Sequence, residues 1–324
     1  MRFNRLDLNL LVALDAVLDE RSVCKAAERV FLSQSAMSCA LARLRDYFGD
    51  ELLVQVGKTL TLTPLGSMLK APVRELLLRA QAITLIKPDF DPAVTGRKIT
   101  LIAADNIVSV LLIDVMREVR AQAPGMEIDV RPVTNRFAEE FNQGDVDLMI
   151  VVDGYASPQL PSEPLFDDTF SCLCWQHGKW AGAPLSLDDY MSAQHVVFDF
   201  GMPRMPALDE LTTVQLGYRR RRAVTVSTPV QIPQFVVGSD YVGTVFTRLA
   251  HRMAETWPLV LTPCPVELPV VRWVVQWHDS RGGDAALIWF KDVLRRVALA
   301  KSADPADSHE SPRARPGWPL PHAA

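Results

Sequence analysis

The chain has 324 residues, enough for two or three domains, and its 48% hydrophobic and 22% charged residues are typical of an ordinary soluble protein. No apolar run reaches the ~18 residues that a membrane span needs. Asp7, Asn9 and Asp15 interrupt the apolar segment at the start of the chain, whereas the apolar segment of a secretory signal is continuous. We therefore expect a cytoplasmic protein without membrane contact. The net charge of -4 argues against a chain that binds polyanions over its whole surface.

The charge is unevenly distributed along the chain. Residues 1–87 carry 12 Lys and Arg against nine Asp and Glu, whereas the remainder carries 22 against 29. A mildly basic head on an acidic body points to nucleic-acid contact at the N-terminus.

Three helices are predicted near the N-terminus. Leu11, Leu14 and Leu18 recur at helical spacing, and the first helix carries them. Ser22 is the expected N-cap of a short second helix, and Ser33 that of a third helix, which runs to about Phe48. Small alanines at 26 and 27 would let neighbouring helices cross closely, as a helix-turn-helix requires.

The third helix has two different faces. Its apolar residues fall four, three and four apart and should face the core: Met37, Leu41, Leu44 and Phe48. The opposite side offers amide and hydroxyl groups, with guanidinium groups toward its end: Gln34, Ser35, Ser38, Ala42 and Arg45, flanked by Arg43. Such a face suits either the major groove of DNA, where short polar groups meet base edges, or plain solvent on a packing helix.

The segment "ELLVQVGKTLTLTP" (51–64) predicts two short strands around a turn at Gly57 and Lys58. A hairpin directly after a helix-turn-helix makes the winged form of the motif. Lys58 would then lie over the DNA backbone.

A further helix is expected to open at Pro64, with Pro72 kinking or restarting it. Apolar residues within it step four, three, four and three residues apart: Leu69, Val73, Leu76, Ala80 and Ile83. This seam suits a partner helix in a dimer, or it packs on the body of the same chain. Two prolines and a glycine in 87–98 then predict a hinge.

Beyond the hinge, short apolar strands alternate with helices, which favours a parallel sheet with helices on its faces. The pattern repeats after residue 167, so we expect two α/β lobes with the chain crossing between them and a ligand crevice at the strand ends. The predicted fold class is α+β multidomain. Its expected parts are a winged helix-turn-helix (1–63), a linker helix and hinge (64–96), a two-lobed domain (97–300; lobe I about 97–166 plus 268–300, lobe II about 167–267) and a disordered tail (301–324).

The stretch "DLNLLVALDAVLDERSVCKAAERVFLSQSAMSCALARLRDYFGDELLV" resembles the N-terminal domain of LysR-type transcriptional regulators. The phrases "RFNRLDLNLLVALDAVL", "LARLR" and "APVRELL" are most similar to the branch of nodulation regulators and regulators of aromatic-compound catabolism. The resemblance implies an effector domain with a fold like that of periplasmic binding proteins, in a homodimer or homotetramer. It implies three partners, which are double-stranded promoter DNA, a small inducer and RNA polymerase. It also implies activation of transcription more often than repression.

Carried onto this chain residue by residue, the resemblance assigns DNA contacts to six positions: Ser33, Gln34, Ser35, Ser38, Arg43 and Lys58. Two positions depart from the family's pattern. Cys39 stands where the family often has a basic residue, and Ser35 where proline is frequent.

Inducer contacts are expected at strand ends that face the crevice: Asp105, Asn106, Ser109, Thr134, Asn135, Phe198, Phe200, Gly201, Thr228, Gly243, Thr244 and Trp273. Phe198 and Phe200 on one strand face could sandwich an aromatic or chlorinated aromatic ring, or they are plain core. Asn106 at a helix start could donate to a carboxylate or phenolate. The run "RRRR" (219–222) is expected to be a solvated surface or a contact between subunits.

Three rival functions are weighed against regulation of transcription. An enzyme would need a motif such as GxGxxG, a P-loop, HExxH or GxSxG, and none occurs, so no catalytic residue, cofactor or metal site is predicted. A solute-binding protein would use the lobes alone and leave the N-terminal motif without a role. A redox sensor would need a reactive thiol, whereas we expect the five cysteines to be buried and reduced, with Cys172 and Cys174 on one strand face.

Overall fold

A computed structural model of the chain describes residues 2–3, 6–57, 59–85, 90–134, 136–199, 201 and 207–302. The chain divides into two units, Met1–Ile86 and Lys87–Ala324. No helix in the described part of the chain is long and apolar enough to cross a membrane.

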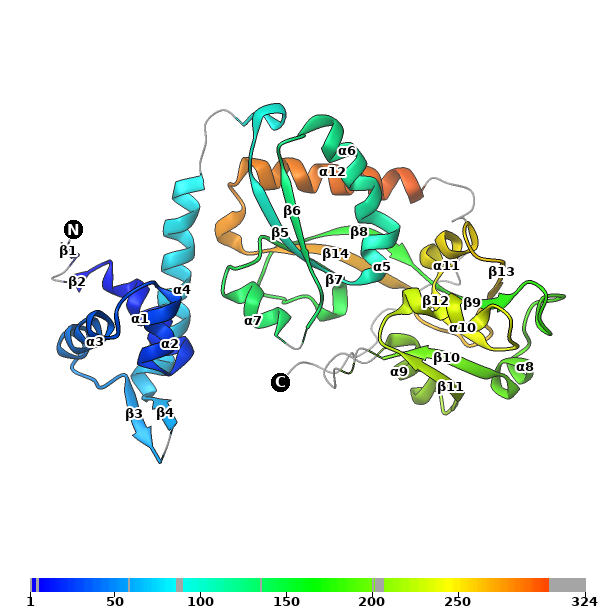
Figure 1. Ribbon diagram of the computed structural model, residues 1–324, viewed down its shortest axis with the longest axis horizontal. Coiled ribbons are helices and arrows are strands. Elements are labelled where there is room, and N and C mark those ends of the chain that lie inside the picture. The colour runs from blue at the N-terminus through cyan, green and yellow to red at the C-terminus, as the bar shows by residue number, and fades with distance from the viewer. Residues whose placement is uncertain are drawn as a thin grey trace. The chain divides into compact units, whose positions relative to one another are not determined.

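The first unit is built from four helices and two small hairpins, with bounds β1 Arg2–Phe3, β2 Leu6–Asp7, α1 Leu10–Glu20, α2 Val23–Arg29, α3 Gln34–Phe48, β3 Leu53–Val56, β4 Thr59–Leu62 and α4 Pro64–Leu85. The β3–β4 hairpin projects from the helices as a wing (Figure 1). The order α2, α3, wing is therefore that of a winged helix-turn-helix, as the sequence predicted.

The predicted caps are confirmed. The Ser22 hydroxyl accepts from the backbone N–H of Lys25, and the Ser33 hydroxyl accepts from that of Ala36. Gly49, with φ +63°, ends α3 in the left-handed conformation that glycine adopts without strain.

The core of this unit lies between α1, α2 and α3. Met37, Leu41 and Leu44 are buried there, and Phe48 packs against them, as the periodicity of α3 predicted. Ala26 and Ala27 are also buried, which lets α2 approach α1 and α3 closely. Each large buried apolar side chain contributes roughly 1.5–3 kcal/mol to stability, so α3 is fixed by its inner face and free to vary on its outer one.

The linker helix α4 starts at Pro64 and continues through Pro72 without a break, so the predicted restart does not occur. The helix is held along its first half by ion pairs to α1. Arg74 Nε lies 2.9 Å from Asp15 Oδ1, and Lys70 Nζ lies 2.9 Å from Asp19 Oδ1. These contacts oppose the break that a missing N–H at Pro72 would otherwise favour.

The second unit has two lobes, each with a five-stranded sheet. The first sheet has the order β6-β5-β7-β14-β8, with bounds β5 Lys98–Ala103, β6 Glu127–Arg131, β7 Leu148–Val152, β8 Ser162–Asp168 and β14 Val271–Trp277. The second has the order β11-β10-β12-β9-β13, with bounds β9 Phe170–Trp175, β10 Gln194–Phe198, β11 Arg221–Val226, β12 Val242–Phe246 and β13 Leu259–Pro263.

Both sheets are mixed rather than parallel, which corrects the prediction. β5 pairs in parallel with β6 and β7, and β10 with β11 and β12. β14 runs antiparallel to β7 and β8, and β9 antiparallel to β12 and β13. The chain passes from lobe to lobe along β8–β9 and again from β13 into β14. Of these strands, β14 and β9 run against the other strands of their sheets, whereas β8 and β13 run with them.

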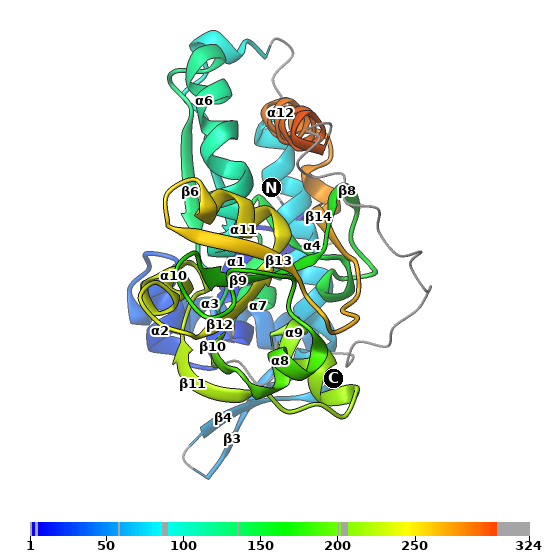
Figure 2. The same ribbon diagram turned by 90° about the vertical axis from the view of Figure 1, so that its right-hand side faces the viewer.

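Helices cover the sheets, with bounds α5 Asp105–Ile107, α6 Ile113–Gln122, α7 Phe137–Asn142, α8 Leu187–Ser192, α9 Leu208–Gln215, α10 Ile232–Val236, α11 Thr247–Ala254 and α12 Ala285–Ser302. A π-helical turn, Val108–Leu112, joins α5 to α6. α6 and α12 lie side by side over the first sheet (Figures 1 and 2). α12 extends two residues into the predicted tail, and residues 303–324 lie outside the described part.

Candidate functional site

The outer face of α3 is polar and open to solvent. Ser33, Gln34, Ser35 and Ser38 are all exposed, and the Ser33 and Ser35 hydroxyls lie 3.0 Å apart. The structure thus brings four of the predicted DNA-contacting residues together at the start of one helix. Hydroxyl and amide groups can both donate and accept hydrogen bonds, which is what base edges require.

The two arginines of α3 differ in how firmly they are held. Arg43 is about half exposed and makes one long ion pair, 3.4 Å, to Asp7. That ion pair, after a backbone hydrogen bond from Asn9, helps to lower the pKa of the Asp7 carboxyl. Arg43 can therefore turn toward a phosphate.

Arg45, expected on the outer face, is instead bound to the base of the wing. Its Nε donates to the Glu51 carbonyl oxygen over 2.9 Å, and its Nη2 donates to that of Leu53 over 3.4 Å. The guanidinium also pairs with the Glu51 carboxylate at 3.1 Å. Arg45 thus fixes the wing to α3. The predicted backbone contact at the wing tip, Lys58, lies outside the described residues.

The predicted seam on α4 is divided. Leu69 and Val73 pack against the core of their own unit, which is the second of the two alternatives that the sequence left open for this seam. Leu76 and Ile83 are 48% and 68% exposed, and Ala80 is exposed as well. The second half of the helix therefore carries an apolar face that its own unit does not cover.

In the second unit, one predicted pair meets across the two lobes. Asp105, directly after β5, accepts a hydrogen bond from the Thr228 hydroxyl, which follows β11. Ser109 donates to the Asp105 carbonyl oxygen over 3.0 Å, and Asn106 is buried. The strand ends of the two lobes are therefore adjacent here, as the prediction required.

Several other predicted inducer residues have structural roles. Phe198 is 7% exposed within the core, and Thr244 is 2% exposed and bonded to the Tyr190 hydroxyl at 2.9 Å. Gly243 lies so close to α10 that a Cβ would be 2.3 Å from Ile232 Cγ2. These three residues help to pack lobe II, and their contact with an inducer stays a prediction.

Of the remaining predicted inducer positions, two make only local hydrogen bonds and two lie outside the described residues. Thr134 is exposed and accepts from the N–H of Arg136, and Gly201 adopts φ +65° and donates to Asp199. Asn135 and Phe200 lie outside the described residues, so the proposed pair of aromatic rings on this strand has only one described member.

An aromatic cluster at the junction of the lobes contains Trp273. Its ring centroid lies 5.3 Å from that of Phe246 and 6.4 Å from that of Phe166. The Arg248 guanidinium lies over the Phe166 ring, with its Cζ 4.2 Å from the ring centroid. Trp273 Nε1 is buried without a hydrogen-bond partner among the described residues, which is uncommon for a buried N–H. Only Trp273 was predicted, because its partners come from strands that are distant in sequence.

The run 219–222 also contains a buried residue, which corrects the prediction of a solvated surface. The Arg220 side chain is 1% exposed, and its Nη1 donates to Asp209 over 2.7 Å. Burial alone would lower the pKa of Arg220, but Asp209, Tyr190 and Glu210 outweigh it and raise the pKa. Nearby, burial lowers the pKa of His195 to about 4.

The cysteines divide between the two units. Cys172 and Cys174 are buried on β9 as expected, and burial raises the pKa of the Cys174 thiol to about 12. Cys24 and Cys39 are exposed, contrary to expectation, because they lie on the outer sides of α2 and α3. A thiol of such high pKa is a poor nucleophile, which argues against Cys174 as a redox sensor.

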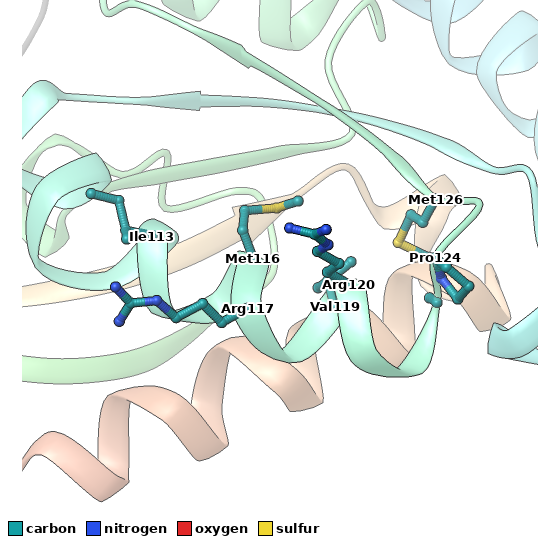
Figure 3. A pocket seen from close by; sticks show the side chains of 8 residues that line it. Ile113, Met116, Arg117, Val119, Arg120, Pro124 and Met126 are labelled. Carbon is teal, nitrogen blue, oxygen red and sulfur yellow. The ribbon is translucent and has the colours of Figure 1, made fainter.

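One hollow in the described part of the chain lies apart from all predicted inducer residues. It has a volume of about 450 Å³ and lies between α6 and the start of β6. Figure 3 shows Met116 and Met126 on either side of Arg120, with Arg117 pointing away from them. The hollow is open and lined by mixed groups, so it does not complete the Asp105 site.

The comparisons with known proteins cover nearly the whole chain. Residues 8–67 match the bacterial regulatory helix-turn-helix protein model of the lysR family, and residues 93–299 match the LysR substrate binding domain. Nodulation protein D 1 of Bradyrhizobium sp. (strain NC92) is 36% identical over 315 residues, 97% of this chain and 99% of that protein.

Solved structures agree with this fold. A probable transcriptional regulator from Pseudomonas aeruginosa has 26% sequence identity and a TM-score of 0.60, covering 91% of this chain and 98% of its own. Full-length OxyR from Pseudomonas aeruginosa, at 18% identity, has a TM-score of 0.67 and covers 91% of this chain and 97% of its own.

Proposed function

The chain belongs to the LysR family of transcriptional regulators, and we propose that the exposed face of α3 reads its operator through Ser33, Gln34, Ser35 and Ser38. The observation that carries this proposal is the polar, uncovered start of α3 beside a wing, within a helix-turn-helix whose other side is fully packed. Bases are read by such groups in the major groove.

Two cations would position the protein without reading sequence. Arg43 is half exposed and weakly paired, and Lys58 occupies the turn of the wing in the sequence. Contacts from both to phosphates would orient α3 on the duplex. In a dimer, two recognition helices would meet half-sites about one helical turn apart, roughly 34 Å.

The experiment that tests this is selection of duplexes from a random DNA pool by the full-length protein at low and moderate salt. We expect an enriched site with two inverted half-sites, and affinity that falls steeply as salt rises. Enrichment of no sequence, or binding that does not depend on salt, would contradict the assignment of α3.

The effector unit is proposed to bind a small inducer between its lobes, beside Asp105, Asn106, Ser109 and Thr228. The hydrogen bond from Thr228 to Asp105 supports this, because it joins the two lobes at their strand ends. The unpartnered N–H of Trp273 in an aromatic cluster supports an aromatic or chlorinated aromatic inducer with a polar substituent.

Titration of aromatic acids and phenols against tryptophan fluorescence tests the inducer proposal. All seven tryptophans lie in the second unit, so the signal reports that unit alone. A saturable change with one class is expected, and the absence of any saturable change across both classes would contradict it.

The remaining assignments extend the same proposal. The uncovered half of α4, at Leu76, Ala80 and Ile83, would pair with a second copy in a homodimer, two of which make a homotetramer. The domain limits are proposed as 1–63, 64–96 and 97–300, followed by a tail. The regulator would act in the cytoplasm, without catalysis, and activate transcription through RNA polymerase.

A solute-binding protein or an enzyme remains the alternative for the second unit considered alone. Neither explains a helix-turn-helix with an uncovered polar face, and no described group of His, Cys, Asp and Glu is arranged to hold a metal ion. The DNA selection experiment distinguishes a transcriptional regulator from these two alternatives.

A further inference from the structure

Phe31 is the most exposed large apolar side chain among the described residues. It is 95% exposed, in the connection between α2 and α3. It belongs neither to the core of its unit nor to an aromatic pair in the described part of the chain. Packing therefore does not explain why the position carries a phenyl ring.

The backbone at this position makes the ring more unexpected still. The N–H of Leu32 donates to the Ala27 carbonyl oxygen over 2.9 Å, and the N–H of Phe31 donates to that of Glu28 over 3.2 Å. This pair of bonds is the Schellman motif, in which the residue at the place of Phe31 is usually glycine, sometimes asparagine. Phe31 has φ +56°, a conformation that is unfavourable for any residue with a Cβ.

A strained backbone and an exposed ring together indicate a role outside folding, because neither stabilises the unit. The position indicates which role. Phe31 opens an unbroken exposed run, residues 31–36, that ends in the first turn of α3 and includes Ser33, Gln34 and Ser35. The ring thus adjoins the face that is proposed to read DNA.

We propose that the Phe31 ring is a specificity-determining contact to DNA, packing on apolar carbon at the edge of the groove that α3 enters. Two parts of DNA offer such carbon, the thymine methyl group and the deoxyribose. Phenylalanine is among the side chains that contact the thymine methyl in known complexes. The inference rests on the proposed placement of α3 on DNA.

The matched variants are Phe31→Asn and Phe31→Tyr in the full-length protein. Asn suits the left-handed position, so hydrogen exchange of amides in residues 23–48 should slow about fivefold. The dissociation constant for a duplex selected by the unmodified protein should nevertheless rise about tenfold. Because no charge is lost, the salt dependence should stay unchanged, and Phe31→Tyr, which keeps the ring, should bind within about twofold of the parent protein.

Binding to the same duplex with uracil in place of thymine distinguishes the two sources of carbon. Weaker binding by the parent protein, but not by Phe31→Asn, identifies the thymine methyl. Equal binding of both duplexes, with Phe31→Asn still impaired, identifies the sugar.

Three results would overturn the inference. Phe31→Asn could bind the selected duplex as tightly as the parent protein, could exchange its amides faster, or could change the oligomeric state in sedimentation. The first result would remove the DNA contact, the second would make the ring a folding element, and the third would make it a protein contact. Failure of the parent protein to select any DNA would instead contradict the proposed function itself.

Discussion

The recognition helix and the inducer site show how differently two kinds of site are encoded. On α3, buried residues recur at helical spacing and most of the others are exposed, so the sequence alone separates Met37 from Ser38. In the second unit, Phe198 and Thr244 carry groups that would suit a ligand, yet both are buried by neighbours from distant strands. A site on one helix face follows from local periodicity, whereas a site between lobes follows from tertiary packing.

The largest effect is expected at Arg220, whose charge is buried in lobe II and depends on tertiary packing. Arg220→Met leaves the Asp209 carboxylate buried without its partner and should lower the free energy of unfolding by about 3–5 kcal/mol. Urea unfolding followed by tryptophan fluorescence measures this for the second unit alone.

The matched control is Arg222→Met. Arg222 binds Glu210 from a half-exposed position, so its loss should change stability by about 1 kcal/mol or less. Equal effects of the two variants would mean that burial of Arg220 does not decide its energetic role.

The next effect concerns His195, whose pKa is lowered to about 4 by burial. Between pH 4 and about 6.5 the unfolded chain binds a proton that the folded chain does not, so stability falls as pH is lowered through this window, by about 3 kcal/mol. Tryptophan-monitored urea unfolding at several pH values measures the loss.

His195→Gln should remove most of this pH dependence, while His177→Gln on the surface should keep it. If the His195 variant loses stability toward pH 4 as steeply as the parent protein, carboxylates of the second unit are responsible instead.

Smaller effects, on DNA affinity and base preference, are expected for variants of the DNA-binding residues. Ser38→Ala should weaken binding to the selected site by about 1–3 kcal/mol and relax base preference at one position. Lys58→Ala should weaken binding to all duplexes alike and reduce the salt slope by about 1, since one phosphate contact is lost. Equal losses on selected and random DNA for Ser38→Ala would remove it from the base-reading residues.

The smallest expected effect is at Thr228. Thr228→Val keeps the shape of the side chain but removes the hydrogen bond to Asp105, and should destabilise the second unit by about 1 kcal/mol. Inducer affinity should change in the same variant, while binding of the first unit to random DNA stays constant. Unchanged inducer affinity would place the inducer away from this bond.

The sequence was sufficient for most elements of the fold. Caps at Ser22 and Ser33, the wing and most strands of both sheets were predicted from local signals. β8, "SEPLFDD", and β13, "LVLTP", were missed because proline and acidic residues hide their strand pattern. Both are edge strands, where such residues are tolerated.

The candidate sites were predictable only in part. Arg45 looked free on a helical wheel, but its length lets it reach the backbone at the base of the wing. Arg220 looked like one of four equal surface charges, and only the fold of lobe II brings Asp209 to it. Side chains whose partners lie on another element cannot be assigned from the periodicity of their own element.

The most direct test of the central claim is genome-wide footprinting of the tagged full-length protein on its own DNA at several salt concentrations. The account predicts discrete sites with dyad symmetry whose occupancy falls steeply as salt rises. Absence of enrichment at any site, at any salt concentration, would contradict it.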